Sequence, residues 1–163
     1  MTNPYRTNLK VVFEVLGHNW IHLSFFVDNK KVAAERISSV PNDWLREIIW
    51  GIGAVAAGYS SESIRLNLEP AGWVLNFKVP ENTSTEVMFT LDYIDDYLSP
   101  KQTTPILVWT GDRILIMKSF WKALRQLQTQ VTDSNEYRHG FPSKELIQLS
   151  DNIDLGSGPI EGQ

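Results

Sequence analysis

The stretch LDYIDDYLSP, residues 91–100, places three carboxylates among two tyrosines. Asp92, Asp95 and Asp96 could act as acid–base catalysts, bind a metal ion, or present negative charge to a cationic partner. Acid–base work by a carboxylate pair requires two environments that separate the pKa values of the pair. Asp95 and Asp96 are adjacent, and we expect both to be solvated, which disfavours catalysis. A solvated loop and a docking surface remain as the two interpretations.

The tyrosines favour the docking surface. Tyr93 and Tyr97 flank the acids, and tyrosine is enriched at protein–protein interfaces. A loop selected only for solubility would not need them. The predicted partner-binding residues are Asp92, Tyr93, Asp95, Asp96 and Tyr97, with Glu81 and Glu86 at the rim.

The sequence has few residues of the types that usually bind metals, and their spacing does not match a known metal-binding motif. His18, His22 and His139 are the three histidines, and none stands in an H-E-x-x-H motif. His18 and His22 are four residues apart, but they fall in a predicted turn and a predicted strand and so do not share a helix face. A site joining His22 to Asp92 or Asp95 is less favoured than an ordinary strand histidine. The chain has no cysteine, which excludes disulfides and cysteine-bound zinc. We therefore predict no metal and no cofactor.

Two other motifs have simpler structural interpretations. GIGAVA, residues 51–56, matches the dinucleotide-binding pattern G-x-G-x-x-G/A, but it follows residues with helical periodicity where that pattern requires a strand. YRHGFP, residues 137–142, could form a polar site, although a turn anchored by Phe141 and Pro142 is favoured. The patterns of serine hydrolases, P-loops and EF-hands are absent. The motifs therefore favour a protein without enzymatic activity.

Alternating and helical periodicities predict the elements that position these residues. The predicted strands are 10–16, 20–27, 31–37, 63–69, 73–79, 86–94 and 106–110. The predicted helices are 41–58 and 112–130, with a short helix after Ser143. The fold class is therefore α+β, a mostly antiparallel sheet of about six to seven strands with two main helices packed on it. Residues 1–151 form a single domain, and residues 152–163 form a flexible tail.

The second helix has an alternative and a defined orientation. Residues 113–117 could instead form a strand, with a shorter helix beginning at Ser119, but the long helix is favoured. Its apolar stripe places Phe120 and Trp121 in the core. Its basic stripe, which contains Lys118, Lys122 and Arg125, is expected to face solvent. In the first helix, Trp50 falls outside the apolar face.

Composition and charge limit the possible partners. The 163 residues are 42% hydrophobic, enough for one sizeable core, and no apolar run could span a bilayer. No signal-peptide core is found at the start of the chain, so a cytoplasmic location is expected. Residues 81–163 hold 12 Asp/Glu against 7 Lys/Arg, and residues 79–100 contain no base. This charge disfavours nucleic acid and favours a basic protein partner.

The order of elements resembles the small immunity proteins encoded beside bacterial polymorphic toxins, including those of contact-dependent growth inhibition. The resemblance covers roughly residues 8–151 and rests on the stretches DWLREIIWGI, LNLEPAGWVLNF, FWKALRQL and YRHGFPSKELIQL. It implies a non-enzymatic protein that binds one cognate toxin domain, often a basic nuclease, and blocks its active site. These families share no invariant motif, so no family residue can be transferred to this chain.

Two further functions stay open at the level of sequence. One is a small-molecule-binding protein or small enzyme with a pocket between sheet and helices. The other is an adaptor that oligomerises through Trp50 or through an uncovered strand edge.

Overall fold

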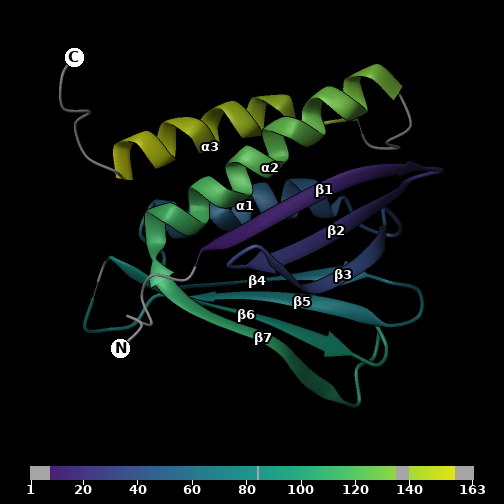
Figure 1. The fold of residues 1–163 in the computed structure, drawn as a ribbon, viewed down its shortest axis with the longest axis horizontal. Helices are drawn as coiled ribbons and strands as arrows, with labels where there is room; N and C mark the ends of the chain where they lie inside the picture. Colours follow the sequence, from purple (N-terminus) through teal and green to yellow (C-terminus); the bar gives the residue numbers. More distant parts are fainter. Residues whose placement is uncertain (1–7, 84, 135–139, 157–163) are drawn as a thin grey trace.

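A computed structural model describes residues 8–83, 85–134 and 140–156 of the chain (Figure 1). The strands are β1 (Leu9–Gly17), β2 (Trp20–Val27), β3 (Lys30–Ser38), β4 (Ser61–Asn67), β5 (Gly72–Lys78), β6 (Glu86–Ile94) and β7 (Thr103–Asp112). The helices are α1 (Trp44–Ala56), α2 (Arg113–Ser134) and α3 (Ser143–Gly156). The predicted α+β class is confirmed.

The seven strands form one antiparallel sheet in chain order, from β1 to β7. Strands β3 and β4 are joined by a single residue pair, Ser38 with Asn67. The sheet therefore divides into a half made of β1–β3 and a half made of β4–β7. The helices lie on the same side of the sheet, with α2 across β1 and α1 against β4 (Figure 1).

A cluster of aromatic rings connects the two halves of the sheet to α2. The ring of Phe25 on β2 lies 5.5 Å from that of Phe89 on β6 and 6.2 Å from that of Phe120 on α2. The ring of Phe77 on β5 lies 5.6 Å from that of Phe120. All four side chains are buried. Each contributes apolar area removed from water, which is the dominant favourable term in folding.

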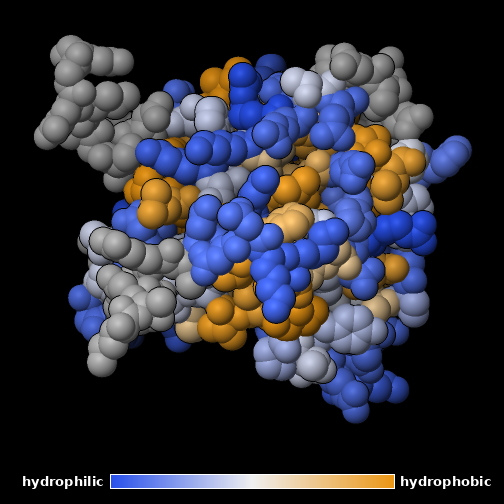
Figure 2. Space-filling view, viewed as in Figure 1, coloured by the Kyte–Doolittle hydropathy of each residue, from blue (hydrophilic) through white to orange (hydrophobic). Residues whose placement is uncertain are grey.

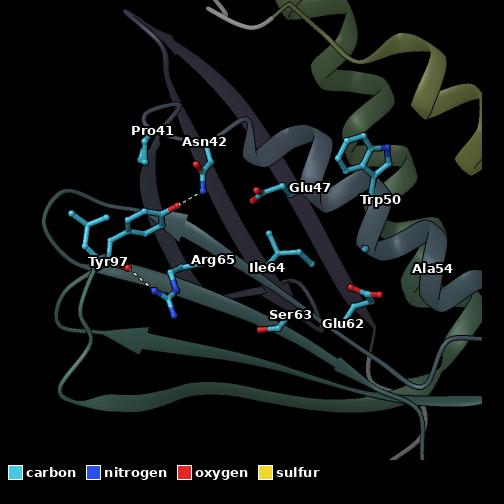
Figure 3. Close-up of a pocket in the computed structure, with 12 residues that line it drawn as sticks. Pro41, Asn42, Glu47, Trp50, Ala54, Glu62, Ser63, Ile64, Arg65 and Tyr97 are labelled. Carbon is cyan, nitrogen blue, oxygen red and sulfur yellow. Dashed lines mark hydrogen bonds between the residues drawn. The ribbon is translucent and has the colours of Figure 1, made fainter.

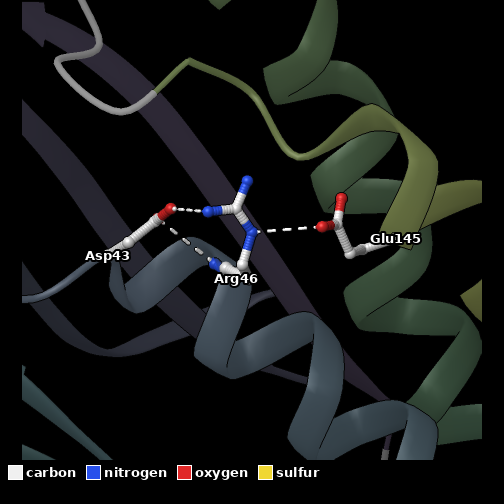
Figure 4. Close-up of polar contacts among 3 residues, drawn as sticks. All are labelled: Asp43, Arg46 and Glu145. Carbon is white, nitrogen blue, oxygen red and sulfur yellow. Dashed lines mark hydrogen bonds and ion pairs between the residues drawn. The ribbon is translucent and has the colours of Figure 1, made fainter.

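Helix α1 is fixed at its first turn by polar contacts (Figure 4). The Asp43 side chain accepts a hydrogen bond from the backbone N–H of Arg46 and so caps the helix. The guanidinium of Arg46 also lies 2.9 Å from the Asp43 carboxylate and 3.2 Å from that of Glu145 on α3. Helix α1 therefore begins at Trp44, slightly later than the predicted start at residue 41. It is held in place against α3.

The structure extends the predicted elements at two places. The segment 113–117 is helical, as favoured, and the strand before it begins at Thr103 rather than at residue 106. Helix α3 continues to Gly156, so residues 152–156, which were expected to belong to the flexible tail, are helical. Residues 157–163 lie outside the described residues.

The orientation of α2 is close to the one predicted. Phe120 is fully buried, as expected, and Lys122 and Arg125 are exposed. Trp121 is only half-buried at the margin of the core, and Lys118 is also half-buried, so both differ from the prediction. Figure 2 shows hydrophilic side chains over much of this side of the molecule, with hydrophobic patches between them. Among the described residues, no helix is long and apolar enough to cross a membrane.

Candidate functional site

The carboxylate of Asp95 forms part of the loop between β6 and β7. Its Oδ1 accepts hydrogen bonds from the backbone N–H groups of Lys101 at 2.9 Å and Gln102 at 3.0 Å. The N–H of Gln102, and then that of Lys101, lowers the pKa of Asp95 because both favour the charged form. Asp95 is exposed, as predicted, but its carboxylate also links the two ends of the loop through these two hydrogen bonds.

Asp96 and Asp92 are also hydrogen-bonded within the chain. The Oδ1 of Asp96 accepts from the backbone N–H groups of Leu98 at 2.8 Å and Ser99 at 2.9 Å, which is the bonding pattern of an Asx turn. The carboxylate of Asp92 accepts from the side-chain amide of Asn76 on β5 at 3.0 Å. The predicted docking acids thus have structural roles in the turn and on the sheet.

Tyr97 occupies a different environment from the predicted one. Its side chain is only 6% exposed. Its hydroxyl accepts from the amide of Asn42, its N–H donates to the Pro70 carbonyl, and its own carbonyl accepts from Arg65. Burial, and then the nearby charge of Glu47, raises the pKa of the Tyr97 phenol. Tyr97 anchors the loop instead of presenting a free aromatic face to a partner.

The predicted site residues do not form one patch. Glu86 opens β6, whereas Asp95 and Asp96 follow its far end. The strand from Glu86 to Ile94 spans about 26 Å at about 3.3 Å per residue. Glu81 precedes β6, on the Glu86 side. Of the predicted acids, only Asp92, Asp95 and Asp96 lie at the same end of β6 as Tyr93, whose side chain is 39% exposed.

The structure contains a larger feature that sequence reasoning missed. A cleft of about 800 Å³ lies between α1 and β4 (Figure 3). One wall is formed by α1, another by consecutive residues of β4, and one end by the segment before α1 together with the loop after β6. The lining residues are Pro41, Asn42, Glu47, Trp50, Gly51, Ala54, Glu62, Ser63, Ile64, Arg65, Tyr97 and Leu98.

The lining pattern locates the cleft along the edge of β4. Successive side chains of a strand point to opposite faces of its sheet. The range 62–65 lines the cleft without a gap, so the cleft follows the strand edge and not one face. The α1 residues Glu47, Trp50, Gly51 and Ala54 recur at helical spacing, which makes them one stripe of that helix.

A glycine allows α1 to approach β4 closely. A Cβ placed on Gly51 would lie 2.8 Å from Cδ1 of Ile64 on β4. Only a residue without a side chain fits this contact without movement of Ile64. Gly51, in the middle of the predicted helix, was the sequence signal for this contact, and the first glycine of the motif GIGAVA therefore reflects packing.

The polar side chains of the cleft are unequally paired. Arg65 donates to the Tyr97 carbonyl at 2.7 Å, and its guanidinium lies 6.0 Å from the centre of the Tyr97 ring. The carboxylates of Glu47 and Glu62 have no hydrogen bond or ion pair among the described residues. Burial, and then the charge of Asp43, raises the pKa of Glu47.

The cleft also exposes apolar surface. Trp50 is 59% exposed on α1, as its position outside the apolar face predicted, and Leu98 is 80% exposed at the end of the cleft. Leu98 belongs to the loop that Asp95 and Asp96 close. The cleft and the remaining acidic loop therefore form one continuous surface.

Histidines do not contribute to this surface in the described part of the chain. The Nδ1 of His22 lies 3.3 Å from the Ser24 hydroxyl on β2. The described residues contain no group of three His, Cys, Asp or Glu side chains that could hold a metal ion. The alternative polar site at residues 137–142, with Tyr137, Arg138 and His139, falls on residues outside the described ones.

Comparisons of the chain with protein-family models, with curated proteins and with solved structures found no match. The geometry of the cleft is therefore the basis for a functional assignment.

Proposed function

We propose that this chain is a non-enzymatic binding protein that neutralises a basic toxin domain, and that it docks through the cleft between α1 and β4 together with the adjoining acidic loop. The cleft is the observation that carries the proposal. It combines an exposed tryptophan, Trp50, with the carboxylates of Glu47 and Glu62, which have no partner among the described residues. Tryptophan is enriched among the residues that dominate interface energetics.

Charge supports a basic partner. The cleft carries Glu47 and Glu62 against one arginine, Arg65, whose guanidinium already binds the Tyr97 carbonyl. Asp95 and Asp96 add negative charge at the end of the cleft, and their hydrogen bonds to backbone N–H groups leave that charge in place. Such a surface attracts a cationic partner and raises the association rate at low salt.

The resemblance to immunity proteins supplies the class of partner. A toxin nuclease must bind phosphate, so its active site is electropositive and complements an acidic surface. Occupying that site with carboxylates inhibits the toxin without chemistry in this chain. The role of the acidic loop differs from the predicted one, because the loop forms the rim and the cleft forms the centre of the interface.

The test is calorimetric titration of the chain with the protein encoded by the neighbouring gene. We expect binding at one to one and loss of that protein's activity at equimolar ratio. Trp50→Ala should weaken binding at least about tenfold, as truncation of a central tryptophan does. Val108→Ala, at an exposed position on β7, is the matched control and should leave affinity unchanged. Failure of the unaltered chain to bind, or equal affinity of both variants, would contradict the proposal.

One observation favours a second function, small-molecule binding or catalysis in the same cleft. Glu47 has a raised pKa and lies near the buried phenol of Tyr97, and such groups can exchange protons. If this function is correct, a small ligand should quench the fluorescence of Trp50 with a stoichiometry of one molecule per chain. The bound ligand should also prevent the partner protein from binding. The protein-binding function is preferred because the cleft is open along a strand edge and not enclosed.

A further inference from the structure

The edge of β4 that faces the cleft carries backbone groups that do not bind β5. The N–H of Leu68 donates to the Ala71 carbonyl at 2.9 Å, and the N–H of Val79 donates to the Ser60 carbonyl at 2.8 Å. In an antiparallel pair, hydrogen-bonded residues alternate along each strand. The even-numbered residues of β4 therefore bond to β5. The N–H and C=O groups of Ser63 and Arg65 point away from β5, and both residues line the cleft.

No strand occupies that edge in the described part of the chain. Strand β3 pairs with β4 only at Ser38 and Asn67, next to the closed end of the cleft. No other described residue of β4 pairs with β3, and Ser63 and Arg65 line the cleft between β4 and α1. An edge with free N–H and C=O groups is a template for a further strand.

We propose that an extended basic segment of the partner protein pairs with β4 as an additional strand in this cleft. The inference rests on the proposed function and specifies how the partner binds. The four lining residues 62–65 span about 10 Å, which accommodates a segment of about four residues. Ser63 and Arg65 each offer one N–H donor and one C=O acceptor. Main-chain bonds of this kind supply affinity, and alternate side chains supply specificity.

The walls of the cleft define the side chains of the bound segment. Every second side chain of an added strand would point toward α1, where Glu47 and Trp50 lie (Figure 3). A lysine or arginine there would pair with the Glu47 carboxylate and could stack on the exposed indole of Trp50. The expected pattern is a basic residue at alternate positions, separated by residues that favour β-structure.

Charge also excludes the main competing occupant, a second copy of this chain. A two-fold contact between β4 edges would bring the Glu47 and Glu62 carboxylates of one copy toward those of the other. Like charges opposite one another across strands are destabilising. A basic segment has the opposite sign and is therefore the occupant that these carboxylates favour.

The test uses two synthetic peptides, acetyl-TKVKVT-amide and its acidic counterpart acetyl-TEVEVT-amide, titrated into the isotopically labelled chain. We expect the lysine peptide to shift the amide resonances of Ser63 and Arg65 and to slow their hydrogen exchange. The acidic peptide should do neither. Shifts centred elsewhere, or equal effects of the two peptides, would overturn the inference.

A proline substitution separates strand pairing from general charge attraction. Proline is tolerated on a strand edge where no N–H is needed for the sheet. Ser63→Pro removes one N–H of the β4 edge within the cleft and should lower the affinity for the lysine peptide at least tenfold. Ser61→Pro removes an N–H of the same edge at a residue outside the cleft and should bind as the unaltered chain does. Circular dichroism and thermal unfolding of both variants confirm that the fold is kept.

The outcomes for the inference and for the proposed function are distinct. If the neighbouring gene product binds Ser63→Pro and Ser61→Pro equally well, the strand-pairing inference is wrong and the proposed function stands. If the lysine peptide binds at Ser63 but the neighbouring gene product does not bind the chain, the proposed function is wrong in its choice of partner. A concentration-dependent dimer that protects the amides of Ser63 and Arg65 without peptide would overturn the inference in favour of a second copy.

Discussion

The side-chain amide of Asn42 donates a hydrogen bond of 2.8 Å to the hydroxyl of Tyr97, across 55 residues of sequence. It joins the segment before α1 to the loop after β6. Both residues line the same end of the cleft. This bond, together with the bond from Arg65 to the Tyr97 carbonyl, fixes the distance between the two walls at that end.

Removing the Tyr97 hydroxyl tests the importance of this bond. Tyr97→Phe keeps the buried ring and leaves the Asn42 amide without its acceptor. We expect a loss of about 0.5–1.5 kcal/mol in the free energy of unfolding, measured by urea denaturation. Tyr93→Phe, at a 39% exposed tyrosine, is the control and should change stability by less than about 0.5 kcal/mol. Equal effects of the two substitutions would show that the hydroxyl of Tyr97 contributes nothing specific.

Asp95 should make stability depend on acid pH. Its folded-state pKa lies below the ordinary value because the N–H groups of Gln102 and Lys101 bind the carboxylate. A lowered pKa stabilises the fold above the unfolded-state pKa of about 3.9, and this contribution is lost as the pH falls through the folded-state pKa. Asp95→Asn should therefore lower stability at neutral pH, and the difference should shrink on acidification. Unfolding by urea at a series of pH values measures it; a constant difference would contradict the assignment.

Glu47 should have the opposite dependence. Its pKa is raised, first by burial and then by Asp43, so the folded chain binds this proton more tightly than the unfolded chain does. The charged carboxylate therefore reduces stability as the pH rises above the unfolded-state value of about 4.3. Glu47→Gln should unfold at higher urea concentration than the unaltered chain at neutral pH, and at the same concentration at low pH.

Glu47→Gln should also weaken binding of the lysine peptide acetyl-TKVKVT-amide. A gain in stability with a loss of binding is the expected behaviour of a residue retained for function. Glu81→Gln, in the loop between β5 and β6, is the control and should change neither property at neutral pH. If Glu47→Gln lowers stability at neutral pH, the carboxylate has a structural partner and the interpretation of the cleft fails.

Substitutions on α2 should lower the free energy of unfolding in the order of how deeply the replaced side chain is buried. Phe120 is fully buried among aromatic rings, and Phe120→Ala should lower the free energy of unfolding by about 3–5 kcal/mol. Trp121 is half-buried, so Trp121→Ala should lower it by less, about 1–3 kcal/mol. Lys122→Ala, at an exposed position, should change it by less than about 0.5 kcal/mol. A reversed order of Phe120 and Trp121 in denaturant titrations would contradict the orientation of α2.

The local signals of the sequence sufficed for most of the fold. The alternation in residues 63–79 predicted the β4–β5 hairpin, and the helical period of residues 113–130 predicted α2. Trp121 was misjudged because the helical period identifies a stripe but not which side of the stripe meets the sheet. The helical end of α3 was missed because the sequence DNIDLG has few strong helix formers, and its Ile153 packs into the core.

The site was harder to predict because its contacts join distant residues. Tyr97 stands among acids and was therefore expected at the surface, while its partners Asn42 and Arg65 lie on other elements. The turn formed by Asp96 had a local signal, an aspartate before serine and proline in a loop. The free edge of β4 had none, because the pairing of β3 with β4 at a single residue pair is a property of the whole sheet.

The contact of α2 with β1 has a consequence for synthesis of the protein. Every strand hydrogen-bonds its neighbour in the chain, so the meander can form as the chain emerges from the ribosome. The inner face of β1, however, is covered by α2, where Gln130 accepts from the N–H of Val15 across 115 residues. At translation rates of about 5–20 residues per second, α2 is synthesised on the order of ten seconds after β1, and the apolar face of β1 stays exposed for that time. Strand β1 is thus made before the other described strands and is covered only once α2 is complete, so its apolar face is available in the meantime to chaperones that hold nascent chains.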